Sequence, residues 1–229
     1  MSIATALTEP GGGDLIAENL ACRRGERIVF TGVSFRLPLG GTLLLMGANG
    51  SGKTSLLRIL ATLLPRTEGR LLWASTPIEA DIAGYRAQLR YIGHQDAVKP
   101  GLTPRETLEF STALHGLGLR RAPGLVETAL AAFALDEVAD WPCRWLSAGQ
   151  RRRLALARLV AAPAPIWLLD EPTSALDHDN QQRLESAIAA HRANGGRVVV
   201  ASHQTIDIVD GTTITLDSFT PPPGYAATS

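Results

Sequence analysis

A glycine-rich segment in the first quarter of the chain carries residue types that bind phosphate groups. It matches the pattern G-x-x-x-x-G-K-[ST], in which glycines let successive backbone N–H groups turn toward one anion. A lysine at the seventh position can reach the terminal phosphates of a nucleotide, and the hydroxyl that follows can ligate Mg²⁺. The segment and the residue after it read Gly47, Ala48, Asn49, Gly50, Ser51, Gly52, Lys53, Thr54 and Ser55. It therefore predicts a nucleoside triphosphate site.

Two acidic residues end an apolar run further along the chain. Ile166–Leu169 predicts a buried strand that delivers Asp170 at its carboxyl end, where ligands bind in parallel sheets. Asp170 is the natural partner for Mg²⁺, and Glu171 can polarise a water for in-line attack on the γ-phosphorus. Acids also end strands on a solvated edge. After a phosphate-binding segment, however, the pair favours a catalytic role.

The hydrophobic pattern around these residues predicts strands that alternate with helices. Leu43–Met46 indicates a buried strand directly before the glycine-rich segment. A helix then runs from Thr54 to about Leu64, and Pro65 ends it. Further strands are predicted at Leu71–Trp73, Leu89–Ile92, Ile166–Leu169 and Arg197–Ser202. This alternation predicts an α/β fold with a parallel core sheet.

The positions of the helices divide the chain. Residues 15–95 and 146–217 hold the predicted core elements, and residues 96–145 are mostly helical in period. One helix in that block begins at a predicted capping box, with Thr103 at the N-cap and Glu106 three residues later. We therefore expect a catalytic core interrupted by a helical subdomain at 96–145.

Composition describes an ordinary globular protein. The formal net charge is zero, which argues against a nucleic-acid partner held by phosphate contacts. Cys22 and Cys143 stand far apart in no metal-binding spacing, so we expect two reduced thiols. Residues 1–14 and 218–229 are typical of flexible tails, and the first lacks the apolar stretch of a secretory signal. No apolar run reaches the roughly 18 residues of a membrane span. A cytoplasmic protein is expected, which reaches a membrane only through partners or through a surface of its own.

A short segment ahead of the two acids resembles the signature of ABC transporter ATPases, L-S-G-G-Q. It reads Leu146, Ser147, Ala148, Gly149 and Gln150. Ser147 is an N-cap residue type, and a helix is predicted to follow it. The alanine replaces the first glycine of the signature, and it would cost energy if that position requires a positive φ. The resemblance implies that this segment contacts ATP bound to a second copy of the chain.

Three further elements resemble ABC motifs in the order that the family has them. Gln95 falls at the glutamine loop, which implies a contact with Mg²⁺ and the attacking water. Asp177 ends a segment that is similar to the D-loop, which crosses the dimer interface. His203 resembles the switch histidine that contacts the γ-phosphate. The aromatic residue that usually stacks on adenine has no counterpart here, and Arg24 could stack in its place through its planar guanidinium.

The resemblance covers residues 15–217 and implies a complete fold. That fold is the P-loop NTPase (RecA-like) nucleotide-binding domain of ABC proteins, with an N-terminal antiparallel β subdomain and an inserted helical subdomain. It implies a dimer that holds two molecules of ATP with Mg²⁺ at its interface. The residues implied in hydrolysis are Lys53, Gln95, Glu171 and His203, and those implied in metal binding are Thr54, Gln95 and Asp170.

Several segments resemble, more narrowly, the haem-exporter ATP-binding subunit of the bacterial cytochrome c maturation system. They are Leu71–Trp73, Tyr91–Gln95, Lys99, Leu102–Phe110 and Leu146–Arg153. This resemblance implies a peripheral subunit on the cytoplasmic face of the inner membrane, docked on integral membrane subunits. Its hydrolysis of ATP would drive release of a haem-loaded haem chaperone, or movement of haem. An exporter subunit for another substrate, such as a lipid or a drug, remains an alternative because the ATPase sequence says little about cargo. An ABC ATPase acting on DNA or ribosomes usually has two cassettes or a long coiled-coil insertion, and this chain has neither.

Overall fold

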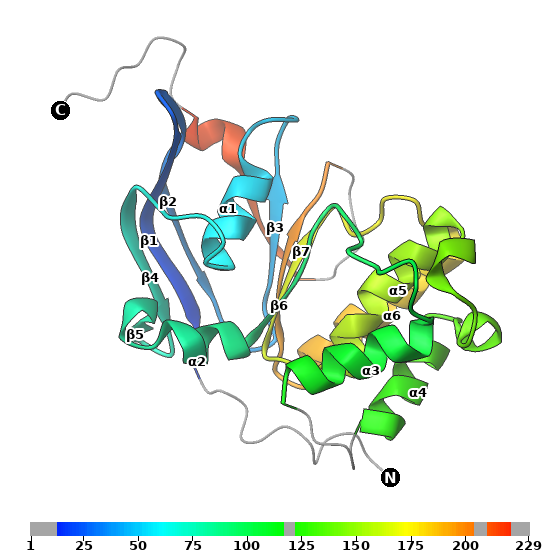
Figure 1. The fold of residues 1–229 in the computed structure, drawn as a ribbon. Helices are drawn as coiled ribbons and strands as arrows, with labels where there is room; N and C mark the ends of the chain where they lie inside the picture. Colours follow the sequence, from blue (N-terminus) through cyan, green and yellow to red (C-terminus); the bar gives the residue numbers. More distant parts are fainter. Residues whose placement is uncertain (1–12, 117–121, 204–209, 221–229) are drawn as a thin grey trace. The chain divides into compact units, whose positions relative to one another are not determined.

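The computed structural model describes residues 13–116, 122–203 and 210–220, which form two compact units (Figure 1). The first unit, which we call the sheet unit, holds two sheets. Its bounds are Met1–Tyr91, Pro165–Asp170 and Arg192–Ser229, of which the structure describes the residues within the ranges given above. The second comprises Ile92–Ala164 and Glu171–His191 and consists mainly of helices; we call it the helical unit. The tails predicted from the sequence lie mostly outside the described residues.

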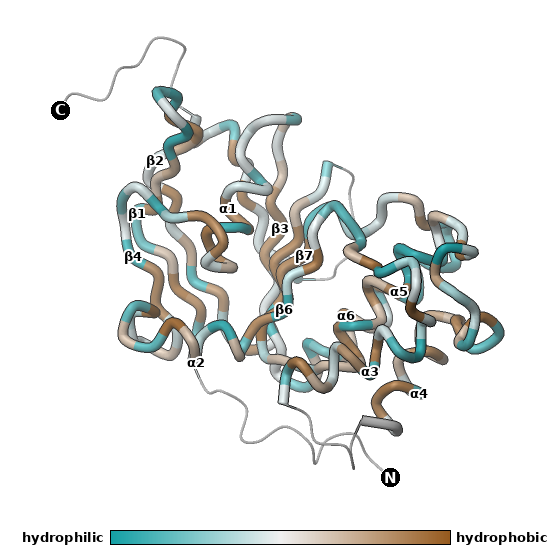
Figure 2. The backbone as a smooth tube through the Cα atoms, in the orientation of Figure 1, coloured by the Kyte–Doolittle hydropathy of each residue, from teal (hydrophilic) through white to brown (hydrophobic). Residues whose placement is uncertain are grey.

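The larger sheet of the sheet unit has five strands in the order β6-β7-β8-β3-β9. Strands β7, β8, β3 and β9 pair in parallel, as the alternation of strands and helices predicts. Every residue of β7 and β8 is buried, and Figure 2 shows β7 and β3 as mainly hydrophobic. Strands buried on both faces read as continuous apolar runs, which is why they are recognisable in the sequence. The bounds are β3 Thr42–Met46, β6 Leu89–Ile92, β7 Ile166–Asp170, β8 Arg197–Ala201 and β9 Thr212–Thr215.

Helix α1, Lys53–Leu60, follows β3 after the glycine-rich segment and packs against the sheet. The sequence predicts that this helix continues to about Leu64, and this prediction is wrong by one turn. Ala61 caps its C-terminus, and Thr62 then adopts a left-handed backbone with φ 58°. A left-handed residue cannot continue a right-handed helix, so the helix ends before Pro65 is reached.

The second sheet of the sheet unit is antiparallel, with the order β2-β1-β4-β5. It confirms the N-terminal antiparallel β subdomain that the family resemblance implies. Strands β1 and β2 form a hairpin that turns at Gly25, where φ is 60° and glycine carries no steric cost. The bounds are β1 Leu15–Arg24, β2 Arg27–Leu37, β4 Glu68–Trp73 and β5 Thr76–Pro77, and a short helix α2 spans Ile82–Ala87.

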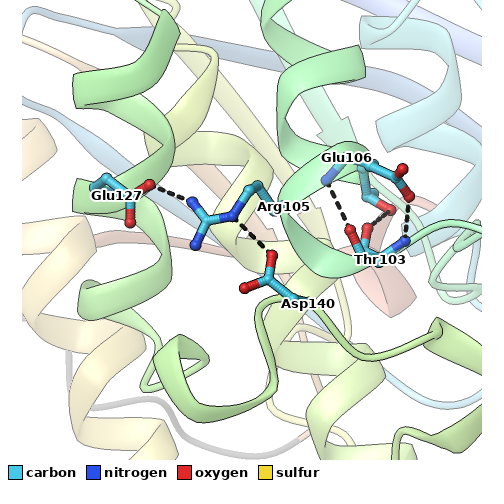
Figure 3. Close-up of polar contacts among 6 residues, drawn as sticks. Thr103, Arg105, Glu106, Glu127 and Asp140 are labelled. Carbon is cyan, nitrogen blue, oxygen red and sulfur yellow. Dashed lines mark hydrogen bonds and ion pairs between the residues drawn. The ribbon is translucent and has the colours of Figure 1, made fainter.

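The helical unit contains α3 Pro104–Leu114, α4 Ala122–Ala132, α5 Ala148–Ala161 and α6 His178–Ala193, the last of which runs to the edge of the unit. Helices α3, α4 and α5 pack against one another. The Thr103–Glu106 capping box is present at the start of α3, and Arg105 bonds both Glu127 and Asp140 (Figure 3). Short 3₁₀ helices span Ile78–Ala80, Asp136–Val138, Cys143–Trp145 and Leu216–Phe219.

Both cysteines are buried and free, as expected. Among the helices that the structure describes, none combines the length and the apolar character needed to cross a bilayer.

Candidate active site

The glycine-rich loop, Gly47–Thr54, joins the end of β3 to the start of α1. Its three glycines, Gly47, Gly50 and Gly52, have φ of 140°, 85° and 106°, a region that L-residues rarely adopt. Gly52 is also the N-cap of α1, and a Cβ there would approach Val29 Cγ1 to 2.6 Å. The backbone path of the loop therefore requires glycine, and it leads directly into the positive end of a helix.

Lys53 is the first residue of α1 and is only 7% exposed. Its Nζ donates hydrogen bonds to Gly47 O at 2.6 Å and Ala48 O at 3.1 Å. The ammonium group is thus held within the loop, where its charge adds to the partial positive charge of the helix N-terminus. This is an arrangement suited to a phosphate group.

Asp170 ends β7 and is 2% exposed. The Thr54 hydroxyl donates to Asp170 Oδ1 at 3.1 Å, and the Tyr91 hydroxyl donates to Asp170 Oδ2 at 3.4 Å. Burial and, to a lesser extent, the negative charge of Asp170 raise the pKa of Tyr91. The structure thus brings together two of the three metal ligands expected from the sequence, both with hard oxygen donors.

Asp217 contacts the glycine-rich loop although nothing in the sequence pattern singled it out. It lies in the 3₁₀ helix after β9, and its Oδ2 accepts a hydrogen bond from the Ala48 N–H at 3.1 Å. A Cβ on Gly47 would lie 2.6 Å from the same oxygen. The first glycine therefore leaves room for a carboxylate that arrives from 169 residues away, a relationship that only the tertiary structure creates.

Glu171 is the first residue of the helical unit after β7 and is half-buried. Its φ of 47° places a non-glycine residue in the left-handed region. Such conformations cost on the order of 1–3 kcal/mol and persist only where neighbouring groups hold them. Its carbonyl oxygen accepts a hydrogen bond from the Arg152 guanidinium at 2.6 Å. The expected base is thus a strained residue with a fixed backbone.

The signature segment forms the N-terminus of α5. Ser147 is the N-cap, and it exchanges hydrogen bonds with Gln150 in a capping box that the sequence analysis did not predict. Ala148 is the first helical residue and does not have a positive φ, so alanine is unstrained at this position. Gly149, in contrast, faces Ala175 O, which would lie 3.3 Å from an added Cβ. Of the two positions, the second glycine of the signature therefore has the tighter surroundings.

The remaining expected residues lie in loops or at the ends of elements. In the sheet unit, Arg24 is exposed at the hairpin end of β1, and His203 is exposed two residues beyond β8. In the helical unit, Gln95 is exposed in the loop after β6. Asp177 caps α6, since its Oδ1 accepts the Asn180 N–H at 2.9 Å. This capping role adds to the one implied by the D-loop resemblance.

Comparison with known proteins identifies the family. The sequence pattern of the ABC transporter family matches residues 30–174, which is more than half of the chain. The chain is 53% identical to the cytochrome c biogenesis ATP-binding export protein CcmA of Rhodospirillum rubrum, over 92% of this chain and 88% of that protein. It is 49% identical to the protein of the same name from Paramagnetospirillum magneticum, over 89% and 94%.

A solved structure supports the fold. An ABC transporter ATP-binding protein from Pyrococcus furiosus aligns with a TM-score of 0.80 at 21% identity, covering 91% of this chain and all of that one. The shared fold agrees with the α/β architecture, with its parallel and antiparallel sheets, that this chain adopts. The chain belongs to the ABC transporter family and, within it, to the cytochrome c biogenesis ATP-binding export proteins.

Proposed function

We propose that this chain hydrolyses ATP to drive an export step in the biogenesis of c-type cytochromes. One observation supports hydrolysis above the others: the Thr54 hydroxyl and the buried Asp170 carboxylate meet beside a phosphate-binding loop. The role in cytochrome biogenesis is supported by 53% identity to an export protein of that name. This identity favours cytochrome biogenesis over export of a lipid or a drug.

The nucleotide would bind in the glycine-rich loop. Backbone N–H groups of residues 47–55, apart from the Ala48 N–H that donates to Asp217, would surround the phosphates. Lys53 would exchange its two loop carbonyls for phosphate oxygens. Thr54 and Asp170 offer the oxygen ligands that Mg²⁺ prefers, with Gln95 as a further expected ligand. Bound Mg²⁺ supplies neutralisation of the charge that develops on the β- and γ-phosphate oxygens. Arg24 would stack on the adenine ring.

Hydrolysis would depend on positioned groups. A water attacks the γ-phosphorus, its O–P bond forms while the bond to the β-phosphate oxygen breaks, and Glu171 accepts the proton. His203 would hold the γ-phosphate in line with the attacking water. Ser147, Ala148, Gly149 and Gln150 of a second copy, with Asp177 nearby, would complete the site from the positive end of α5.

The partners follow from this mechanism. They are a second copy of the chain, integral membrane subunits of a haem-handling complex and, through those subunits, a haem chaperone. The chain would act at the cytoplasmic face of the inner membrane, with no nucleic-acid partner. Movement of the helical subdomain at 96–145, with the Gln95 loop, would transmit closure to the membrane subunits.

The test is the substitution Glu171→Gln in the full chain and in the cell. ATP binding should persist while hydrolysis is lost, since the amide preserves shape but accepts no proton. In the cell, haem held on the membrane haem chaperone should accumulate and mature c-type cytochromes should disappear. Normal turnover would reject Glu171 as the base. Loss of hydrolysis with normal cytochromes c would support the ATPase activity of the parent chain but reject its role in cytochrome biogenesis, and another cargo would have to be sought.

The adenine contact is tested separately. Arg24→Ala should weaken ATP binding without changing the rate of hydrolysis at saturation. An unchanged affinity for ATP would remove Arg24 from the site.

A further inference from the structure

A buried arginine on α5 connects three segments of the helical unit. Arg152 is 2% exposed, and its guanidinium donates in three directions. Nη2 donates to Glu171 O at 2.6 Å and Nε to Pro172 O at 3.2 Å. Nη1 donates to Gly93 O at 3.0 Å and to Asp96 Oδ1 at 3.2 Å. One side chain therefore binds the chain on either side of Gln95 and the backbone of Glu171.

Burying the charge of Arg152 costs desolvation free energy, so its presence calls for a reason beyond packing. A buried guanidinium must be fully hydrogen-bonded to offset its desolvation. An apolar side chain of similar volume often gives equal or greater stability at such a position. Arginine presents five donors in a rigid planar fork, so one side chain can bind acceptors in several fixed directions at once. The acceptors of Arg152 are concentrated at the two loops that carry Gln95 and Glu171, which points to a role beyond packing.

The strained backbone of Glu171 adds a second reason. A residue at φ 47° is held by its surroundings, and Arg152 binds the carbonyl oxygens of both Glu171 and Pro172. The Gln95 loop is held in a similar way, since Arg158 on the same helix donates to Asp96 O at 3.1 Å. Helix α5 thus fixes both loops, chiefly through one guanidinium.

We infer that Arg152 is a positioning residue for ATP hydrolysis, which sets the Glu171 backbone and the Gln95 loop relative to the helix that begins at the signature segment. The inference rests on the proposed function. Because α5 begins at Ala148, directly after its N-cap Ser147, a displacement of the signature segment would pass through Arg152 to both loops. The proposed role of Arg152 is indirect, through its bonds to the Glu171 backbone and the Gln95 loop.

The test compares Arg152→Lys with Arg153→Lys in the full chain. Arg153 is the neighbouring residue on α5, and its Nη1 donates to two carbonyls, Phe133 O and Ala134 O, that belong to neither loop. Arg152→Lys should lower kcat by about 10²-fold, the effect of a misplacement of about 1 Å, while KM for ATP changes less than about twofold. Arg153→Lys should lower the melting temperature without this fall in kcat.

Two further variants keep the inference open to refutation. Arg152→Ala should regain part of its kcat when ethylguanidinium is added, whereas Arg153→Ala should not respond. Asp96→Asn leaves the guanidinium in place and should lower kcat even if the Arg152 variants fail to fold. Equal effects of the Arg152 and Arg153 variants, or normal kcat in both Arg152→Lys and Asp96→Asn, would overturn it. Glu171→Gln is measured in parallel: if that variant hydrolyses ATP normally, it is the proposed mechanism that fails.

Discussion

The Thr54 hydroxyl donates a hydrogen bond to Asp170 Oδ1 at 3.1 Å, although 116 residues separate the two in the sequence. Thr54 lies in the first turn of α1, and Asp170 ends β7, the strand against which that helix packs. The pair is the point at which the loop and the acidic strand end become one site. Predictions about cation dependence start from it.

Asp170→Asn should raise the concentration of Mg²⁺ that supports half-maximal hydrolysis, because the substitution replaces an anionic metal ligand with a neutral amide. Titration of ATPase activity with Mg²⁺ measures this. Tyr91→Phe is the matched control, since it removes the other hydroxyl on the same carboxylate and no expected metal ligand. An unchanged Mg²⁺ requirement in Asp170→Asn would exclude this carboxylate from the metal site.

Asp217→Ala should weaken ATP binding, because it removes the acceptor that holds the Ala48 N–H at the start of the glycine-rich loop. Loss of one such bond costs about 1 kcal/mol, which also predicts a lower free energy of unfolding. Asp217→Asn keeps an acceptor oxygen, so its affinity for ATP and its free energy of unfolding should be closer to those of the parent chain. Isothermal calorimetry with an ATP analogue and chemical denaturation measure both effects. Equal affinities in all three chains would show that the loop needs no such anchor.

The two capping boxes allow stability and activity to be separated. Ser147→Ala and Thr103→Ala remove matching N-caps from α5 and α3, and each should cost about 1 kcal/mol of stability. Only Ser147→Ala should lower the rate of ATP hydrolysis, because only that cap lies in the signature segment. Thermal unfolding and steady-state ATPase assays compare the pair. Equal loss of activity in both variants would reduce Ser147 to a helix cap.

Ala148→Gly restores the usual signature but should not raise activity. Alanine at this position already has an ordinary backbone, and glycine in a helix is less favourable than alanine by up to about 1 kcal/mol. Gly149→Ala should be the damaging change, since its Cβ would lie 3.3 Å from Ala175 O. Hydrolysis rates of the two variants at saturating ATP test this order, and a gain of activity in Ala148→Gly would contradict it.

The Cys22 thiol should react slowly with iodoacetamide in the folded chain. Burial raises the pKa of Cys22, so at pH 8 a smaller fraction is thiolate than in the unfolded chain. Since the folded pKa lies above the unfolded one, stability from the neutral thiol is complete below the unfolded pKa and declines as pH rises through the folded one. Mass spectrometry of native and denatured samples follows the alkylation. Equal rates in the two samples would indicate that the folded chain does not protect Cys22.

The sequence by itself determined the fold class, and it proposed the residue types of the candidate site. Strands β7 and β8 are largely apolar runs, and the glycine-rich loop carries a local residue pattern, so both are visible without coordinates. The Thr103 capping box was predicted for the same reason, because it depends on residues three apart. Local rules failed at the end of α1, where a left-handed Thr62 stops the helix before Pro65.

Only the tertiary structure decided which distant groups support the site. Asp217 reaches the loop from 169 residues away, and Arg152 binds carbonyls at Gly93 and Glu171. A backbone carbonyl or N–H is present at every residue and leaves no trace in the sequence. Contacts to these groups depend on the path of the folded chain, and only the folded structure reveals them.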